Sequence, residues 1–83
     1  MGNDSDNLGN DNEAGISREL SLGSQGLDVI RLQQRLAEKG FNPGDIDGIF
    51  GDNTRGAVVA FQRAMKLLDD GIVGRQTSKA LGF

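Results

Sequence analysis

Apolar side chains recur every three or four residues along residues 27–39, which is the spacing of one face of an α-helix. Gln33 lies next to this face, and Gly40 follows the stretch as a residue suited to ending a helix. The pattern therefore predicts a first amphipathic helix. Its predicted buried face consists of Val29, Leu32 and Leu36.

Two later stretches show the same spacing. Residues 52–65 form the second predicted helix, and residues 75–81 form a short third helix. The second helix is predicted to direct one set of side chains toward the core: Thr54, Ala57, Val58, Phe61, Ala64 and Met65. Its opposite face carries Arg55, Gly56, Val59, Arg63 and Lys66. The three stretches together indicate an all-α fold.

One phrase occurs twice, at residues 47–58 and again 23 positions later at residues 70–81. Both copies read D-G-I-[F/V]-G-x-x-T-x-x-A-[V/L]. Asp-Gly favours a tight turn, and the second glycine of each copy suits a helix N-cap. We expect turn and cap roles for Asp47, Gly48, Gly51, Thr54, Asp70, Gly71, Gly74 and Thr77. Two apolar pairs are predicted to plug the loops onto the core: Ile49 with Phe50, and Ile72 with Val73.

The chain divides into a polar N-terminal segment and one small domain. Residues 1–19 are rich in Gly, Asn, Asp and Ser and carry a net charge of −4, so we expect a disordered acidic tail or linker. Residues 20–83 carry a net charge of +1 and hold all three predicted helices. This part is predicted to form a compact three-helix bundle with two Asp-Gly loop-to-helix repeats.

Composition excludes several classes of function. The 83 residues include no Cys, His, Trp or Tyr, which removes thiolate sites, imidazole chemistry and the usual sugar-stacking rings. The nearly neutral domain has no basic surface for nucleic acid, and no apolar run reaches the roughly 20 residues of a membrane helix. We therefore expect no metal, no cofactor, no nucleic-acid partner and no membrane insertion. The first residues lack a signal-peptide pattern, so we expect any export signal to lie outside this sequence.

Three aspartates, Asp45, Asp47 and Asp52, lie close together around the first repeat. Setting Gly48 at position six of a calcium-binding loop puts proline at position one and threonine at position twelve, where an oxygen ligand and a bidentate Glu are required. A carboxylate pair for glycoside cleavage needs a cleft, which so small a domain hardly offers. We therefore interpret the aspartates as turn and cap residues and expect no catalytic site.

The outer face of the second predicted helix has two open interpretations. Arg55 and Arg63 form either a solvated surface or a site for a carboxylate or phosphate. Gly56 in mid-helix, with Val59 exposed beside it, would provide a flat patch for a ligand or a partner.

Two glutamines hold matching places in the pattern. Gln33 and Gln62 each directly follow a predicted core residue. This position favours a structural role, in which the amide lies at the edge of the core and hydrogen-bonds loop backbone.

The combined motifs of residues 20–83 resemble the peptidoglycan-binding-like domain, type 1. The first motif reads Leu22-Gly23-x-x-Gly26-x-x-Val29-x-x-Leu32-Gln33-x-x-Leu36-x-x-x-Gly40. The second reads Asp47-Gly48-Ile49-Phe50-Gly51-x-x-Thr54-x-x-Ala57-Val58-x-x-Phe61-Gln62. The third reads Asp70-Gly71-Ile72-Val73-Gly74-x-x-Thr77.

The resemblance implies a non-catalytic, monomeric module of a bacterial or phage protein. It would act in the cell envelope (periplasm, cell wall or extracellular). Such modules bind peptidoglycan, through its glycan strand or its peptide stem, and hold an attached wall-active enzyme near its polymer. Known carriers include amidases, transpeptidases and phage endolysins. As ligand contacts we select residues of the first loop and the second helix: Asn42, Asp45, Asn53, Arg55 and Arg63.

Two other functions are weighed against this one. A protein–protein interaction or scaffold module is the alternative, because a fold does not by itself fix a function. A self-sufficient hydrolase is disfavoured, since the chain has no His or Cys and little room for an active-site cleft.

Overall fold

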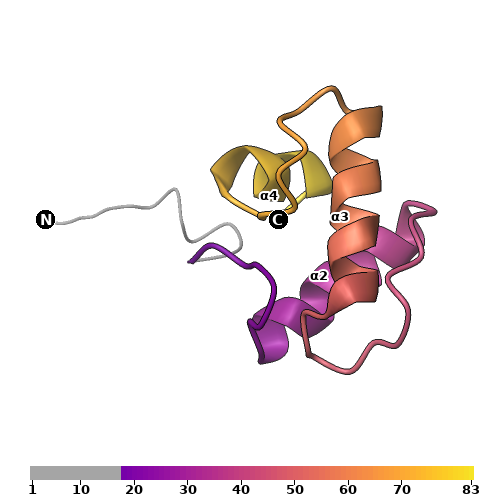
Figure 1. Cartoon of the computed structure of the whole chain (residues 1–83), viewed down its shortest axis with the longest axis vertical. Coiled ribbons are helices and arrows are strands. Elements are labelled where there is room, and N and C mark those ends of the chain that lie inside the picture. Colours follow the sequence, from indigo (N-terminus) through magenta and orange to yellow (C-terminus); the bar gives the residue numbers. More distant parts are fainter. Residues whose placement is uncertain (1–17) are drawn as a thin grey trace, which may run out of the picture.

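The computed structural model describes residues 18–83 and shows three helices around one core (Figure 1). Helix α2 is Leu27–Glu38, helix α3 is Asp52–Ala64 and helix α4 is Arg75–Leu81. Figure 1 shows α2 crossing the N-terminal half of α3, while α4 lies beside its C-terminal half. The predicted all-α three-helix fold is confirmed. The first two helices end one residue earlier than predicted, because Lys39 and Met65 are their C-cap residues.

The predicted tail over residues 1–19 lies almost entirely outside the described residues, so the domain boundary stays a prediction. Arg18 and Glu19 belong to the described part. The Arg18 guanidinium donates a hydrogen bond of 2.7 Å to the backbone carbonyl of Gln25 and lies 3.4 Å from the Asp28 carboxylate. Arg18 is therefore attached to the N-terminal side of α2.

Two isolated antiparallel bridges connect the segment before α2 to the two repeats. Leu20 and Val73 exchange backbone hydrogen bonds of 3.1 and 2.8 Å. Gln25 forms the other bridge with Ile49. Each bridge holds one copy of the repeated phrase, so this segment positions both loops against the helices.

All three helices end with the same backbone motif. The residue after the C-cap, or the C-cap itself in α4, has a left-handed conformation: Gly40 (φ 91), Lys66 (φ 60) and Gly82 (φ 91). The following N–H then bonds back to a carbonyl five residues earlier: Phe41 to Leu36, Leu67 to Gln62, and Phe83 to Ser78. This arrangement satisfies carbonyls that a helix end leaves open, and it confirms Gly40 as the predicted stop.

The core consists of ten apolar side chains from the helices and from the segments that precede them. They are Leu20, Val29, Leu32, Leu36, Phe50, Ala57, Val58, Phe61, Val73 and Leu81. Phe41 packs on its edge against Phe61, with ring centroids 5.5 Å apart and an interplanar angle of 89°. The edge-to-face geometry is one of the favourable arrangements for aromatic rings.

The predicted apolar plugs are correct for one residue of each pair and wrong for the other. Phe50 and Val73 are buried, but Ile49 is 51% exposed and Ile72 is 37% exposed. Neighbouring residues in an extended segment point in opposite directions, so only one of each pair can face the core. Each loop is therefore closed by a single buried side chain, and an isoleucine remains at the surface.

The predicted core face of α3 is also too long. Its buried stripe ends at Gln62, two residues before the helix ends at Ala64. Ala64 and Met65, which were expected in the core, are exposed. They lie in the solvent-facing last turn and contribute little to the packing.

Gly56 offers a test of the helix itself. A Cβ added at Gly56 would meet no heavy atom within 4 Å, and the residue is exposed in the middle of α3. Gly56→Ala should therefore stabilise the domain by about 0.5–1 kcal/mol, because alanine has the higher helix propensity. Urea unfolding at neutral pH measures the change. A loss of stability would contradict the helix as described.

Candidate functional site

Gln33 organises the first copy of the repeat. Its Nε2 lies 3.2 Å from Asp47 Oδ1, 3.1 Å from the carbonyl of Ile49 and 3.0 Å from Thr54 Oγ1. Its Oε1 accepts a 2.9 Å hydrogen bond from the N–H of Gly48. One fully buried amide thus joins α2 to the turn over residues 47–49 and to the first turn of α3. We call these five residues the first clasp.

Gln62 repeats this arrangement in the second copy. Its Nε2 lies 3.1 Å from Asp70 Oδ1, 3.0 Å from the carbonyl of Ile72 and 3.1 Å from Thr77 Oγ1. Its Oε1 accepts a 2.9 Å hydrogen bond from the N–H of Gly71. These five residues form the second clasp. The structural role predicted for both glutamines is confirmed.

The turn glycines of the two clasps adopt a backbone conformation that only glycine takes up without strain. Gly48 (φ 79) and Gly71 (φ 74) are left-handed. An added Cβ would lie 3.1 Å from Ile30 Cγ1 in the first case and 3.2 Å from Arg55 Cγ in the second. A side chain at either position would be strained both by the backbone and by its neighbour.

The cap glycines occupy their predicted places, since Gly51 precedes α3 and Gly74 precedes α4. Their φ values are −104 and −95, so neither needs glycine for its backbone conformation. The two threonines predicted as cap residues, Thr54 and Thr77, are buried and accept the hydrogen bond of a clasp glutamine.

Asp47 is held in its ionised form by the first clasp. The backbone N–H of Ile49, 3.0 Å away, and the amide of Gln33 lower the pKa of Asp47 below its ordinary value. Both donors interact more strongly with the carboxylate than with the neutral acid. The charge therefore belongs to the folded loop and is not available as a proton donor near neutral pH.

This lowered pKa predicts a loss of stability in acid. A carboxyl whose pKa is depressed on folding stabilises the protein above the unfolded pKa of about 3.9, and its contribution disappears as the pH falls through the folded pKa. We expect the thermal midpoint to fall below about pH 4, and to fall less in Asp47→Asn than in the wild type. Asp45→Asn is the matched control, because Asp45 is exposed in the same loop. Equal acid sensitivity of Asp47→Asn and wild type would contradict the prediction.

Three of the proposed ligand contacts lie in the loop between α2 and α3 or at the start of α3, namely Asn42, Asp45 and Asn53. Two of them have structural roles there. Asn42 Oδ1 accepts a 2.9 Å hydrogen bond from the N–H of Gly44. Asn53 packs beneath the same glycine, since a Cβ on Gly44 would lie 2.9 Å from Asn53 Cβ. Asp45 is exposed. The loop therefore covers the start of α3.

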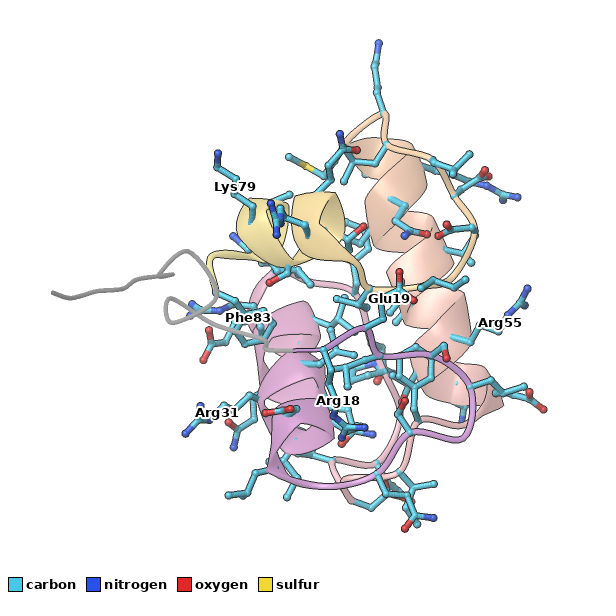
Figure 2. All side chains as sticks on the ribbon, turned by 90° about the vertical axis from the view of Figure 1, so that its left-hand side faces the viewer. Arg18, Glu19, Arg31, Arg55, Lys79 and Phe83 are labelled. Carbon is cyan, nitrogen blue, oxygen red and sulfur yellow. The ribbon has the colours of Figure 1, made fainter. Side chains whose placement is uncertain are left out.

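The two arginines lie farther along α3. Arg63 Nε is 2.7 Å from Asp69 Oδ2, and this hydrogen bond holds the pKa of Asp69 below its ordinary value. Figure 2 shows Arg55 projecting from α3 into solvent, with its stem next to Gly71. Val59 is half-buried and also contacts the Gly71 position, so the flat exposed patch predicted at Gly56 and Val59 is wrong for Val59. The five proposed contacts do not meet in one cleft.

An open groove of about 220 Å³ lies between the loop that connects α3 to α4 (residues 65–74) and the start of α4. Figure 2 shows Glu19 where the chain enters α4. The groove is lined by Glu19, Leu67, Leu68, Asp70, Ile72, Gly74, Arg75, Gln76 and Thr77. Sequence reasoning missed it, because Glu19 was assigned to the tail and the two leucines to a connection. The leucine pair before the second repeat was the available signal.

The described residues show neither metal nor membrane features. Within residues 18–83 no three His, Cys, Asp or Glu side chains gather so that they could hold a metal ion. No helix in this range has the length and apolar character needed to cross a membrane.

Comparisons with known proteins match the whole helical domain. Residues 25–81 match the model of the family described as "Putative peptidoglycan binding domain". A spore cortex-lytic enzyme of Bacillus cereus is 41% identical over 69 residues, which are 83% of this chain and 27% of that enzyme. The N-acetylmuramoyl-L-alanine amidase CwlM of Mycobacterium tuberculosis is 45% identical over 58 residues, 70% of this chain and 14% of the amidase. The chain thus spans only about a quarter or less of these curated relatives.

A solved structure matches both in size and in fold. The crystal structure of the SleB N-terminal domain superimposes with a TM-score of 0.78 and 40% sequence identity. The match covers 82% of this chain and 93% of that domain.

Proposed function

This chain belongs to the peptidoglycan-binding domain family, and we propose that it is a non-catalytic module that binds peptidoglycan and holds a wall-active enzyme at its polymer. The observation that carries the proposal is where its relatives match. Residues 25–81 match the family model, and the relatives are much longer enzymes, of which this chain covers 27% and 14%. The attached enzyme, its reaction and a site of action in the cell envelope are part of the proposal.

The benefit of such a module is physical. Once the module is bound, an enzyme joined to it meets the wall at an effective concentration set by the linker. The chemical step is unchanged, so the module itself needs no acid, base or nucleophile. The clasps fit this role, because they use their carboxylates and hydroxyls to fix loops. We also propose that the module acts as a monomer.

Binding to purified sacculi tests the function. The wild-type domain should co-sediment with sacculi and remain in solution when they are omitted. A helical protein of similar size and charge is the control. Binding no greater than that of the control would overturn the proposed function.

A partner-binding role is favoured by one observation, namely apolar side chains that lie at the surface. Leu22 and Leu27 are 57% and 69% exposed around the start of α2. A scaffold module predicts that wall fragments leave the amide resonances unchanged while a protein partner shifts them. It also predicts no binding to sacculi above the control, so the sacculus experiment separates the two functions.

A further inference from the structure

The two clasps differ in the connection that leads into them. Gln33 and Asp47 are 14 residues apart, whereas Gln62 and Asp70 are 8 residues apart. The second copy therefore lacks six residues that the first copy has. The extra residues of the first copy extend α2 and form a longer loop.

In the first copy this loop covers the start of α3. Pro43 is buried, and its carbonyl lies 3.5 Å from Thr54 Oγ1, which donates to it. Gly44 lies against the Asn53 side chain. The first clasp thus has a peptide segment of its own chain on the surface formed by Asn53 and Thr54.

In the second copy the equivalent surface is open. Gln76 and Thr77 correspond to Asn53 and Thr54, and both line the groove. Thr77 is 4% exposed and accepts from Gln62, but within residues 18–83 no acceptor receives a hydrogen bond from its hydroxyl. A buried hydroxyl donor therefore lies at the groove without the carbonyl that its counterpart has.

The remaining walls of the groove combine an apolar surface with three charged side chains. Two are the carboxylates of Glu19 and Asp70, and the third is the guanidinium of Arg75, so the lining carries a net negative charge of one. Leu68 is 75% exposed, and Leu67 and Ile72 lie beside it in the groove lining. Asp70 uses Oδ1 in the clasp, while its other carboxylate oxygen has no partner in the described part of the chain. The Glu19 carboxylate likewise has none there. An aliphatic arm that ends in an ammonium group matches these walls.

We propose that the groove binds a peptide stem of peptidoglycan, an inference that rests on the proposed function. A backbone carbonyl of the stem accepts a hydrogen bond from Thr77, as the Pro43 carbonyl does from Thr54. An amine-bearing side chain of the stem runs over Leu67 and Leu68 and places its ammonium group between Glu19 and Asp70. No aromatic ring lines the groove, so it lacks the stacking surface that a glycan would use.

Titration of the ¹⁵N-labelled chain with soluble probes tests the ligand class. The probes are a synthetic stem peptide with a free side-chain amine, the same peptide with that amine acetylated, and the disaccharide without peptide. The free-amine peptide should shift the amides of residues 67–77, and acetylation should weaken its binding about tenfold, because a charge-assisted hydrogen bond is lost. Shifts caused by the disaccharide alone, or equal affinity for both peptides, would overturn the proposal.

Exposed side chains allow tests that leave the fold intact. Glu19→Gln should weaken binding of the free-amine peptide about tenfold, and Leu68→Ala about threefold. The matched controls are Glu38→Gln and Leu27→Ala, which change exposed residues outside the groove and should bind as the wild type does. Wild-type affinity in both groove variants would overturn the proposal.

The two proposals fail in distinguishable ways. Wild-type protein that binds sacculi, together with groove variants that bind them equally well, would remove the groove and leave the proposed function. Wild-type protein that binds neither sacculi nor the free-amine peptide would remove both.

Discussion

Replacing Gln33 by alanine should leave the domain close to its unfolding transition at room temperature. The change removes the clasp amide and leaves the buried N–H of Gly48 without its acceptor. Cavity formation and the orphaned donor together should cost about 3–5 kcal/mol. A domain of this size has a total free energy of unfolding of roughly 3–10 kcal/mol. One buried polar side chain therefore supports much of the stability.

Gln34 provides a matched control, because it is the same residue type in the next position of α2 and is exposed. Gln34→Ala should change the free energy of unfolding by less than about 0.5 kcal/mol. Urea unfolding followed by circular dichroism compares the two variants. Equal stability of Gln33→Ala and Gln34→Ala would show that the first clasp does not hold the loop.

Phe61→Ala should produce a loss of similar size from apolar packing. Phe61 is 1% exposed, belongs to the buried core and contacts Phe41 edge to face. Truncating a buried phenylalanine costs about 3–5 kcal/mol, and the aromatic pair adds about 1 kcal/mol. The thermal midpoint should fall steeply, or the unfolding transition should disappear.

Phe83 is the matched control for this change. It is half-buried and contacts Arg35, whose guanidinium carbon lies 5.8 Å from the ring centroid. Phe83→Ala should lower stability by about 1–2 kcal/mol, clearly less than Phe61→Ala, because Phe83 is only partly buried at the edge of the core and its cation–π contact is weak. If Phe83→Ala destabilised the domain as much as Phe61→Ala, the core would be centred elsewhere.

Much of the fold follows from the order of residues. Helical periodicity predicted all three helices, and the repeated Asp-Gly phrase predicted the turns and the positions of the cap glycines. The structural role of Gln33 and Gln62 was also predictable from their places after core residues. These features depend on neighbours along the chain, which a single sequence shows directly.

Features that depend on spatial direction were less predictable. The exposure of Ile49 and Ile72 results from alternation in two short extended segments, which hydrophobicity alone does not reveal. The apolar period of α3 suggested Met65 as a core residue, but the helix ends beyond the buried stripe. Hydrophobic character predicted burial correctly only where a partner element covers the position.

The candidate site required a comparison between the two copies. The proposed contact set of Asn42, Asp45, Asn53, Arg55 and Arg63 followed from charge and loop position. The groove instead results from the absence of a covering loop in the second copy and from Glu19, which is brought there by the bridge between Leu20 and Val73. The contribution of residues 42–55 to binding remains a separate prediction.

Competition on sacculi tests most directly whether this module holds peptidoglycan through its peptide stem. Labelled protein is first bound to sacculi, and an excess of soluble stem peptide or of glycan strands without peptide is then added. The stem peptide should release the protein, and the bare glycan should leave it bound. Release by the glycan together with retention in the presence of the stem peptide would contradict the account.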